Sequence, residues 1–223
     1  MNEIHKVRSV TWYGQDVFEL ALERDGLEFA PGDCLALYAE EGRVSRPYSI
    51  SSGTDEKVLR FLIRRMKDGA VSTFLADRKP GDEVRVSPPF GWFRPGEKAA
   101  KSPFVFVATG TGIAPFLAYL RSHPKVAPVA CLYGVRQFAD AVDVAWLQKT
   151  GNMKLAVSRE SVPPHHHGRV TDLLEQLPCD PNTDYYLCGL DAMIDDVTNW
   201  LDARGVDITR IHRECFFNAS YSA

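Results

Sequence analysis

The chain has 223 residues, of which 45% are hydrophobic and 25% charged, and its formal net charge is -3 at pH 7. These values are typical of a folded globular protein and argue against a disordered chain, a collagen or a coiled coil. The small net charge gives no general attraction to nucleic acid, and the most apolar stretch is interrupted by glycine, threonine and proline. We therefore expect neither a nucleic-acid partner nor a membrane span.

The five cysteines lie far apart in the sequence, without the local spacing of a zinc or iron–sulfur site. We expect no bound metal. An odd number of scattered cysteines favours a reducing compartment, so a cytoplasmic location is expected.

The first hundred residues read as short strands separated by glycine and proline turns. Strands are expected at 7–13, 16–23, 59–64 and 83–87, with one short helix at 71–78. Many short strands between turn residues favour an antiparallel barrel or sandwich. We predict that residues 1–99 form an antiparallel β-barrel domain.

After Pro103 the pattern changes to strands that alternate with helices. Strands are expected at 104–108, 129–133, 154–158, 184–188 and 208–217, and helices at 116–121, 141–149, 170–176 and 192–203. This alternation indicates βαβ units. Residues 100–223 are therefore predicted to form an α/β domain with a doubly wound parallel sheet.

A glycine-rich turn, Thr109-Gly110-Thr111-Gly112-Ile113-Ala114-Pro115, joins the first of these buried strands to a helix. Gly110 and Gly112 allow the backbone to approach a pyrophosphate, and the positive end of the helix dipole favours that anion. Pro115 stands where a dinucleotide fingerprint has its third glycine. A plain glycine turn is the alternative explanation.

The ends of the next two strands bear on which nucleotide is bound. An NAD site has a carboxylate about 20 residues after the glycine turn, but the second strand ends in Tyr133-Gly134-Val135-Arg136. The third strand ends in Ser158 and Arg159. A hydroxyl and a guanidinium suit a 2′-phosphate, which favours NADP(H). Arg159 could instead pair with Glu160 or face solvent.

Two further segments in the first half carry phosphate-binding and ring-stacking side chains. In Arg46-Pro47-Tyr48-Ser49-Ile50-Ser51-Ser52, the arginine can neutralise a phosphate, the tyrosine offers a flat face and the serine a hydroxyl. Gly69 and Ser72 open the expected short helix, where an anion can bind.

These pieces occur together in an order that resembles the ferredoxin-NADP(+) reductase superfamily over nearly the whole chain. The matching segments are RPYSISS, GAVS, GTGIAP, VSRE, CGLDAM and a near-terminal Glu-Cys-Phe. The resemblance implies an N-terminal flavin-binding barrel, a C-terminal NAD(P)-binding domain, and the cofactors FAD and NADP(H).

The same resemblance implies roles for residues in the barrel. Arg46 would contact the flavin pyrophosphate, Tyr48 would pack on the isoalloxazine, and Ser49 would lie near flavin N5. The further flavin-binding candidates are Ile63, Arg64, Gly69, Val71 and Ser72.

In the second half, the resemblance places Thr111 and Gly112 near the NADP diphosphate or nicotinamide. Ser158 and Arg159 match ligands of the 2′-phosphate. The last set acts at the nicotinamide and flavin: Cys188 beside nicotinamide C4, Glu214 in proton movement near N5, and Phe216 over the flavin. Without the resemblance, Cys188 would read as an ordinary buried cysteine at a strand end.

Two features depart from the plant-type pattern. Phe216 stands where the plant-type chain ends in a tyrosine, and seven residues follow it, so that Tyr221 could replace Phe216 or the tail could reach the FAD adenine. The stretch from Gly168 to Asp172 resembles the reductase components of oxygenases, many of which use NADH. NAD(H) therefore stays possible.

The predicted function is FAD-dependent electron transfer between NADP(H) and a one-electron carrier such as ferredoxin or flavodoxin, by hydride transfer between nicotinamide C4 and flavin N5. One alternative is an NADH-dependent reductase that serves an oxygenase or another redox subunit. Another is a non-catalytic subunit with the flavin-binding fold. The basic run from Arg64 to Lys67 could dock an acidic carrier or form a solvated loop.

Overall fold

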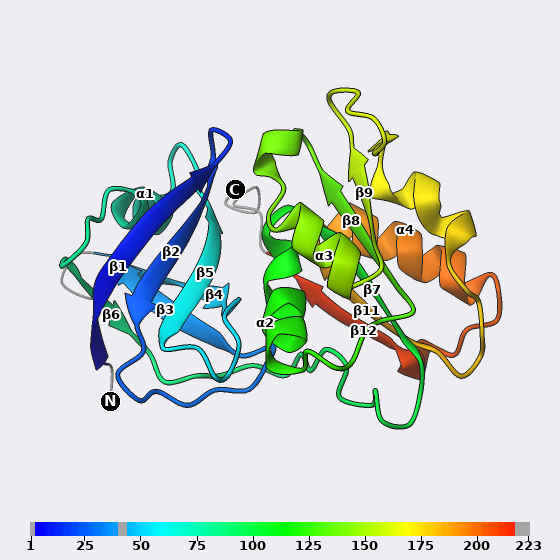
Figure 1. Ribbon diagram of the computed structural model, residues 1–223, viewed down its shortest axis with the longest axis horizontal. Coiled ribbons are helices and arrows are strands. Elements are labelled where there is room, and N and C mark those ends of the chain that lie inside the picture. Colours follow the sequence, from blue (N-terminus) through cyan, green and yellow to red (C-terminus); the bar gives the residue numbers. More distant parts are fainter. Residues whose placement is uncertain (1–2, 40–43, 217–223) are drawn as a thin grey trace. The chain divides into compact units, whose positions relative to one another are not determined.

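The computed structural model describes residues 3–39 and 44–216 (Figure 1). The chain forms two compact units, the first made of Met1–Arg94 and Ala114–Ser122, the second of Pro95–Ile113 and His123–Ala223. The segment Ala114–Ser122 thus groups with the first unit, although it follows the glycine-rich turn in sequence. Among the described residues, no helix combines the length and apolarity needed to cross a bilayer.

The first unit is built on a six-stranded sheet with the order β4-β3-β6-β1-β2-β5. Its strands are β1 (Glu3–Tyr13), β2 (Val17–Glu23), β3 (Cys34–Ala39), β4 (Val44–Ser49), β5 (Val58–Arg64) and β6 (Glu83–Val86), and its helices are α1 (Ala70–Ala76) and α2 (Ala114–Ser122). All neighbouring strands are antiparallel. A bridge from Ile50 to Phe61 links the two end strands of this order and closes the barrel. The predicted antiparallel barrel is confirmed.

Period-two alternation fills the barrel interior. In β6, Val84 and Val86 are buried while Glu83 and Arg85 face outward. The same core takes Leu35 from β3 and Phe61 from β5, both without exposed surface.

Two barrel strands, β3 and β4, were not among the predicted elements. Pro47 lies inside β4 and lacks the N–H that a central strand needs. The structure accommodates it because β4 is the end strand of the sheet order and pairs along its length with β3 alone. An edge position explains why a proline-containing segment is a strand here.

The second unit is a six-stranded parallel sheet with the order β10-β9-β8-β7-β11-β12. Its strands are β7 (Phe104–Thr109), β8 (Ala130–Val135), β9 (Met153–Val157), β10 (His166–His167), β11 (Asp184–Gly189) and β12 (Ile211–Cys215). Its helices are α3 (Val144–Thr150) and α4 (Asp191–Asp202), with 3-10 segments η2 (Gly110–Ile113), η3 (Phe138–Asp140), η4 (Val170–Gln176) and η5 (Ile208–Arg210).

The connections of this sheet run outward from β7 through β8 and β9, and then return to β11 on the other side of β7. Val197 of α4 and Leu173 of η4 pack on one face of the sheet, and Figure 1 shows α3 on the opposite face. The doubly wound prediction is confirmed. Strand order reverses between β7 and β11, which is where ligands bind in such sheets.

Three element predictions in this unit differ in detail from the structure. The segment 170–176 is a 3-10 helix, not an α-helix. The helix expected from residue 141 begins at Val144, because Asp143 has a left-handed φ of 50° and breaks the turn before it. The strand expected from residue 208 begins at Ile211, because Asp207 caps a 3-10 turn by accepting the Thr209 N–H.

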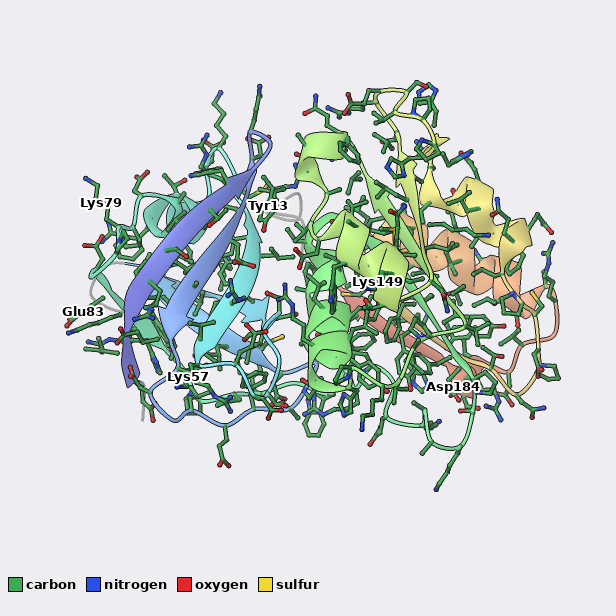
Figure 2. The ribbon with its side chains drawn as sticks, viewed as in Figure 1. Tyr13, Lys57, Lys79, Glu83, Lys149 and Asp184 are labelled. Carbon is green, nitrogen blue, oxygen red and sulfur yellow. The ribbon has the colours of Figure 1, made fainter. Side chains whose placement is uncertain are left out.

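Asp184, labelled in Figure 2, stands at the start of β11, and its carboxylate is buried. It accepts hydrogen bonds from Ser102 Oγ, from Arg210 Nη1 at 3.1 Å and from His212 Nε2 at 3.0 Å, and Lys98 Nζ lies 3.5 Å away. Burial raises the pKa of Asp184, but the hydrogen bonds from Ser102 and His212 and the charge of Lys98 outweigh it. The net result is a pKa below the ordinary aspartate value.

This arrangement predicts acid-sensitive stability. Because the folded-state pKa of Asp184 is depressed, its contribution is complete above the unfolded pKa of about 4 and is lost as pH falls through the folded value. Asp184→Asn should destabilise the protein by about 2–3 kcal/mol at pH 7, since it leaves partly buried cations unpaired. Urea unfolding of both proteins at pH 7 and pH 3 checks this. A constant difference between them across that range would contradict it.

Candidate functional site

The first candidate flavin residues of the first unit lie on β4. Tyr48 lies opposite Leu35 and Ser49 opposite Cys34 in the β3–β4 register. Successive side chains of a strand point to opposite faces, so a flat ring can touch both Tyr48 and Ser49 only by lying along the strand edge. Among the strand pairs of the described residues, Tyr48 and Ser49 pair with β3 alone, and the bridge to β5 begins one residue later, at Ile50.

The side chains on β4 differ in environment. Arg46 is exposed, and its Nη1 donates to the Ser45 carbonyl at 2.8 Å; among the described residues no carboxylate pairs with it. Tyr48 is half-buried against the barrel core. Burial raises the pKa of Tyr48 to about 12, against a lowering effect of the Arg46 charge. The phenol therefore stays protonated at neutral pH, beside a cation suited to phosphate.

The other flavin candidates lie at the end of β5 and in the turn to α1. Ile63 is fully buried and Arg64 half-buried at the strand end. Ser72 Oγ accepts the Met66 N–H at 3.0 Å and donates to the Gly69 carbonyl at 3.2 Å. A Cβ on Gly69 would lie 2.8 Å from the Met66 Cβ, so this turn requires glycine.

The hydroxyl of Ser72 is used within the turn itself. Its hydroxyl holds the turn closed, so Ser72 acts on the shape of the loop. The donors that the turn offers to an anion are the N–H groups of the first helical residues, including Val71, which have no partner within the helix. The role of this turn in binding pyrophosphate stays a prediction.

The nucleotide candidates of the second unit lie at the carboxyl ends of its parallel strands. Thr109 ends β7, and η2 carries Thr111, which is half-buried, and Gly112, which is buried. A Cβ on Gly112 would lie 2.7 Å from the carbonyl carbon of Cys188 and 2.8 Å from Gly189 Cα. The turn after β7 thus packs backbone against backbone on the end of β11, at the point where strand order reverses.

The end of β11 is also fixed by its contacts with β12. Cys188 is fully buried, and its Sγ donates to Glu214 Oε2 at 3.7 Å across the β11–β12 pair. The Phe216 N–H donates to the Gly189 carbonyl at 3.0 Å, and the Leu190 N–H donates to Thr109 Oγ1 at 2.9 Å. A thiol, a carboxylate and an aromatic residue are therefore gathered beside the glycine-rich turn. Phe217 and Tyr221 lie outside the described residues.

Ser158 and Arg159 follow β9 directly and are both exposed. The Glu160 carboxylate is directed toward η3, where its Oε1 accepts the Phe138 N–H at 2.6 Å. The Arg159 N–H donates to the Arg136 carbonyl at 2.9 Å, which places the exposed Arg136 next to it at the end of β8. Two arginines and one serine hydroxyl thus share one edge of the sheet.

In the sequence, Arg136 stands out only because it occupies the strand end where an NAD site would have a carboxylate. Its position beside Arg159 follows from the parallel β8–β9 register, in which Val135 pairs with Val157. Cys34, whose Sγ lies 3.3 Å from Ser49 Oγ, was also not among the predicted site residues. No signal in the sequence joins these two residues. Among the described residues, no three His, Cys, Asp or Glu side chains form a group that could hold a metal ion.

Comparison with known proteins bears on both units. The oxidoreductase FAD-binding domain family matches residues 6–94, and the oxidoreductase NAD-binding domain family matches residues 106–199. The flavodoxin/ferredoxin–NADP reductase of Escherichia coli is 30% identical over 213 residues, which cover 86% of this chain and 86% of the relative. The toluate 1,2-dioxygenase electron transfer component of Pseudomonas putida is 31% identical over 85% of this chain, which spans 59% of that relative's length.

Solved structures show the same fold. The Amycolatopsis cytochrome P450 reductase GcoB matches with a TM-score of 0.86 and 28% identity, over 99% of this chain and 71% of the other. The ferredoxin NADP+ reductase of Neisseria gonorrhoeae, solved with FAD and NADP, has a TM-score of 0.86 at 21% identity over 97% and 99% of the two chains. The chain therefore belongs to the ferredoxin-NADP(+) reductase superfamily and is an oxidoreductase with an FAD-binding and an NAD(P)-binding domain.

Proposed function

We propose that the protein transfers electrons between NADP(H) and a one-electron carrier through bound FAD. The choice of NADP(H) is carried by one observation: Arg136, Ser158 and Arg159 lie together at the carboxyl ends of β8 and β9, and no aspartate or glutamate ends either strand. A carboxylate there would favour a free ribose, whereas guanidinium groups favour a phosphate.

The residues of the barrel fit a flavin nucleotide. The edge of β4 offers a half-buried tyrosine ring for stacking and an exposed guanidinium for phosphate. When bound, FAD supplies the chemistry, since its N5 exchanges hydride with nicotinamide C4 and its ring passes electrons singly to a carrier. Within this proposal, Arg46 neutralises the pyrophosphate, Tyr48 supports the ring and Ser49 donates to or accepts from N5. The proposed pyrophosphate site is shaped by the end of β5 and by the turn into α1, with the residues Ile63, Arg64, Gly69, Val71 and Ser72.

The residues of the second unit fit a nicotinamide nucleotide. Glycine at position 112 lets the turn pack directly against the Cys188 backbone at the end of β11, and the diphosphate is proposed to lie at this turn. Thr111 offers a hydroxyl at the start of that turn. Cys188 is proposed to border the nicotinamide C4, and Glu214, hydrogen-bonded to the Cys188 thiol, to hold or release a proton. Phe216 follows β12 and is proposed to cover the flavin.

The electron carrier is proposed to be an acidic ferredoxin or flavodoxin, or a redox subunit of similar charge. Arg65 is exposed, and its guanidinium lies 5.0 Å from the ring centroid of the partly exposed Trp12. Met66 and Lys67, next in the chain, are exposed as well. A basic surface with aromatic and apolar side chains suits an acidic carrier, because opposite charges speed the encounter.

A second function is favoured by the comparisons. The Pseudomonas relative is named as an electron transfer component of a dioxygenase, which favours a role as the reductase of an oxygenase partner. In this second function the proposed reductant is NADH. The segment Gly168-Arg169-Val170-Thr171-Asp172 is consistent with this reading.

One experiment separates these two functions. The protein purified with FAD is mixed anaerobically with NADPH or NADH, and the flavin absorbance is followed over time. We expect NADPH to bleach the flavin faster than NADH does. In Ser49→Ala the hydride step should be at least tenfold slower than in the parent protein. With ferredoxin as the acceptor, the turnover rate should fall as the salt concentration rises, because salt screens the attraction between opposite charges. Faster reduction by NADH would favour the oxygenase-type reductase, and no reduction by either coenzyme would contradict both proposals.

A further inference from the structure

The hydroxyl of Ser49 has a neighbour in the barrel that none of the assigned roles uses. Cys34 is the direct cross-strand partner of Ser49 in the β3–β4 pair, and the Sγ–Oγ distance is 3.3 Å. Only 8% of Cys34 and 4% of Ser49 is exposed. Water screens a buried hydrogen bond only weakly. The bond between Cys34 and Ser49 therefore polarises the Ser49 hydroxyl and affects any further hydrogen bond that this hydroxyl makes.

The backbone of Cys34 is also held from its other side. The Cys34 N–H donates to the Phe90 carbonyl at 2.7 Å, and the Phe90 N–H donates to the Cys34 carbonyl at 3.0 Å. Next to it, Arg94 Nη2 donates to Asp33 Oδ1 at 2.8 Å. The backbone of Cys34 is thus held between β4 and the loop that contains Phe90, which keeps its Cβ facing Ser49 across the strand pair.

Either member of the pair can be the donor. A thiol is a weak donor and a weak acceptor, and a serine hydroxyl has one hydrogen and two acceptor lone pairs. In one arrangement the Cys34 S–H donates to Ser49 Oγ, and the Ser49 hydrogen is directed to another acceptor. In the reverse arrangement Ser49 donates to Cys34 Sγ, and Ser49 Oγ accepts from another donor. The pair can therefore present Ser49 as a donor or as an acceptor.

Flavin N5 requires both arrangements, because it is an acceptor in the oxidised ring and carries a hydrogen in the reduced ring. We propose that Cys34 is a positioning residue that reverses its hydrogen bond with Ser49 as the bound FAD changes redox state. This inference rests on the proposed function, in which Ser49 faces N5. Cys34 does not react covalently and gains or loses no electrons.

The proposal predicts the sign of a change in reduction potential. In the reduced state Ser49 Oγ accepts from N5–H, so Cys34→Ala removes an acceptor from the Ser49 hydrogen. In the oxidised state the same variant removes only a weak donor from an oxygen. Because losing an acceptor of a buried hydroxyl donor costs more than losing a weak thiol donor, the variant should destabilise the reduced form and make the potential more negative.

The test measures the FAD reduction potential of the holoprotein by spectroscopic titration. Cys34→Ala should change the equilibrium constant for reduction three- to tenfold, and tenfold corresponds to about 30 mV for two electrons. Cys34→Ser keeps a group that both donates and accepts and should stay near the parent value. Cys131→Ala, at a second buried cysteine, is the matched control and should leave the potential unchanged.

A double-mutant cycle shows whether Cys34 acts through Ser49. In a Ser49→Ala background, Cys34→Ala should no longer shift the potential. A folded Cys34→Ala with the parent potential, or a shift that persists without Ser49, overturns the inference while the proposed function stands. If neither coenzyme reduces the FAD bound to the parent protein, the proposed function is wrong, and the inference that rests on it is wrong as well.

Discussion

Gly112→Ala is expected to lower the rate of coenzyme oxidation about a hundredfold and to reduce coenzyme binding, with NADPH and NADH affected alike. The added Cβ would lie 2.7 Å from the Cys188 carbonyl carbon, and the obstacle is backbone, which cannot rotate away. The turn or the end of β11 must shift, and a displacement of about 1 Å in a hydride-transfer site lowers the rate by about that factor. Stopped-flow reduction of the flavin and coenzyme titration measure both effects.

Gly110→Ala is the matched control in the same turn. Gly110 has a left-handed φ of 55°, but a Cβ added there would meet no atom within 4 Å, so its substitution has a conformational cost without a clash. That cost is about 1 kcal/mol in stability. We expect Gly110→Ala to fold slightly less stably and to keep most of its activity. Equal losses in the two variants would show that turn flexibility, and not the contact with β11, determines activity.

The difference between these glycines shows what sequence can and cannot provide. The pattern of a buried strand followed by Thr109 to Pro115 located the turn, because continuous apolar runs and glycines are local signals. It did not distinguish Gly110 from Gly112. That distinction depends on the end of β11, which lies more than seventy residues later in the chain and is brought there by strand order.

The same limit explains the residues that were missed. Cys34 meets Ser49 through an antiparallel register, and Arg136 meets Arg159 through a parallel one. Registers depend on how whole strands pair, so neither neighbour can be read from local sequence. The barrel strand β4 was missed for a different reason: Pro47 argues against a strand unless its edge position is already known.

Coenzyme choice is the second large effect. Arg159→Ala is expected to raise KM for NADPH about tenfold or more, with a change below about twofold for NADH. The 2′-phosphate is the only group that distinguishes the two coenzymes, and loss of one charge-assisted hydrogen bond in an exposed position corresponds to about 1.5 kcal/mol, or about a factor of ten. Steady-state kinetics with both coenzymes and ferricyanide as acceptor provide the comparison.

Arg136→Ala tests the contribution of the neighbouring strand. If both guanidinium groups hold the 2′-phosphate, each single variant weakens NADPH selectively, and the double variant should lose most of the preference for NADPH over NADH. Lys125→Ala is the control, because Lys125 is an exposed cation that precedes β8 and so lies toward the opposite end of that strand. A matching rise in KM for NADPH and NADH would instead assign the arginines to the diphosphate that both coenzymes share. Because that outcome would remove the observation that favours NADP(H), it would shift the balance toward the NADH-dependent reductase.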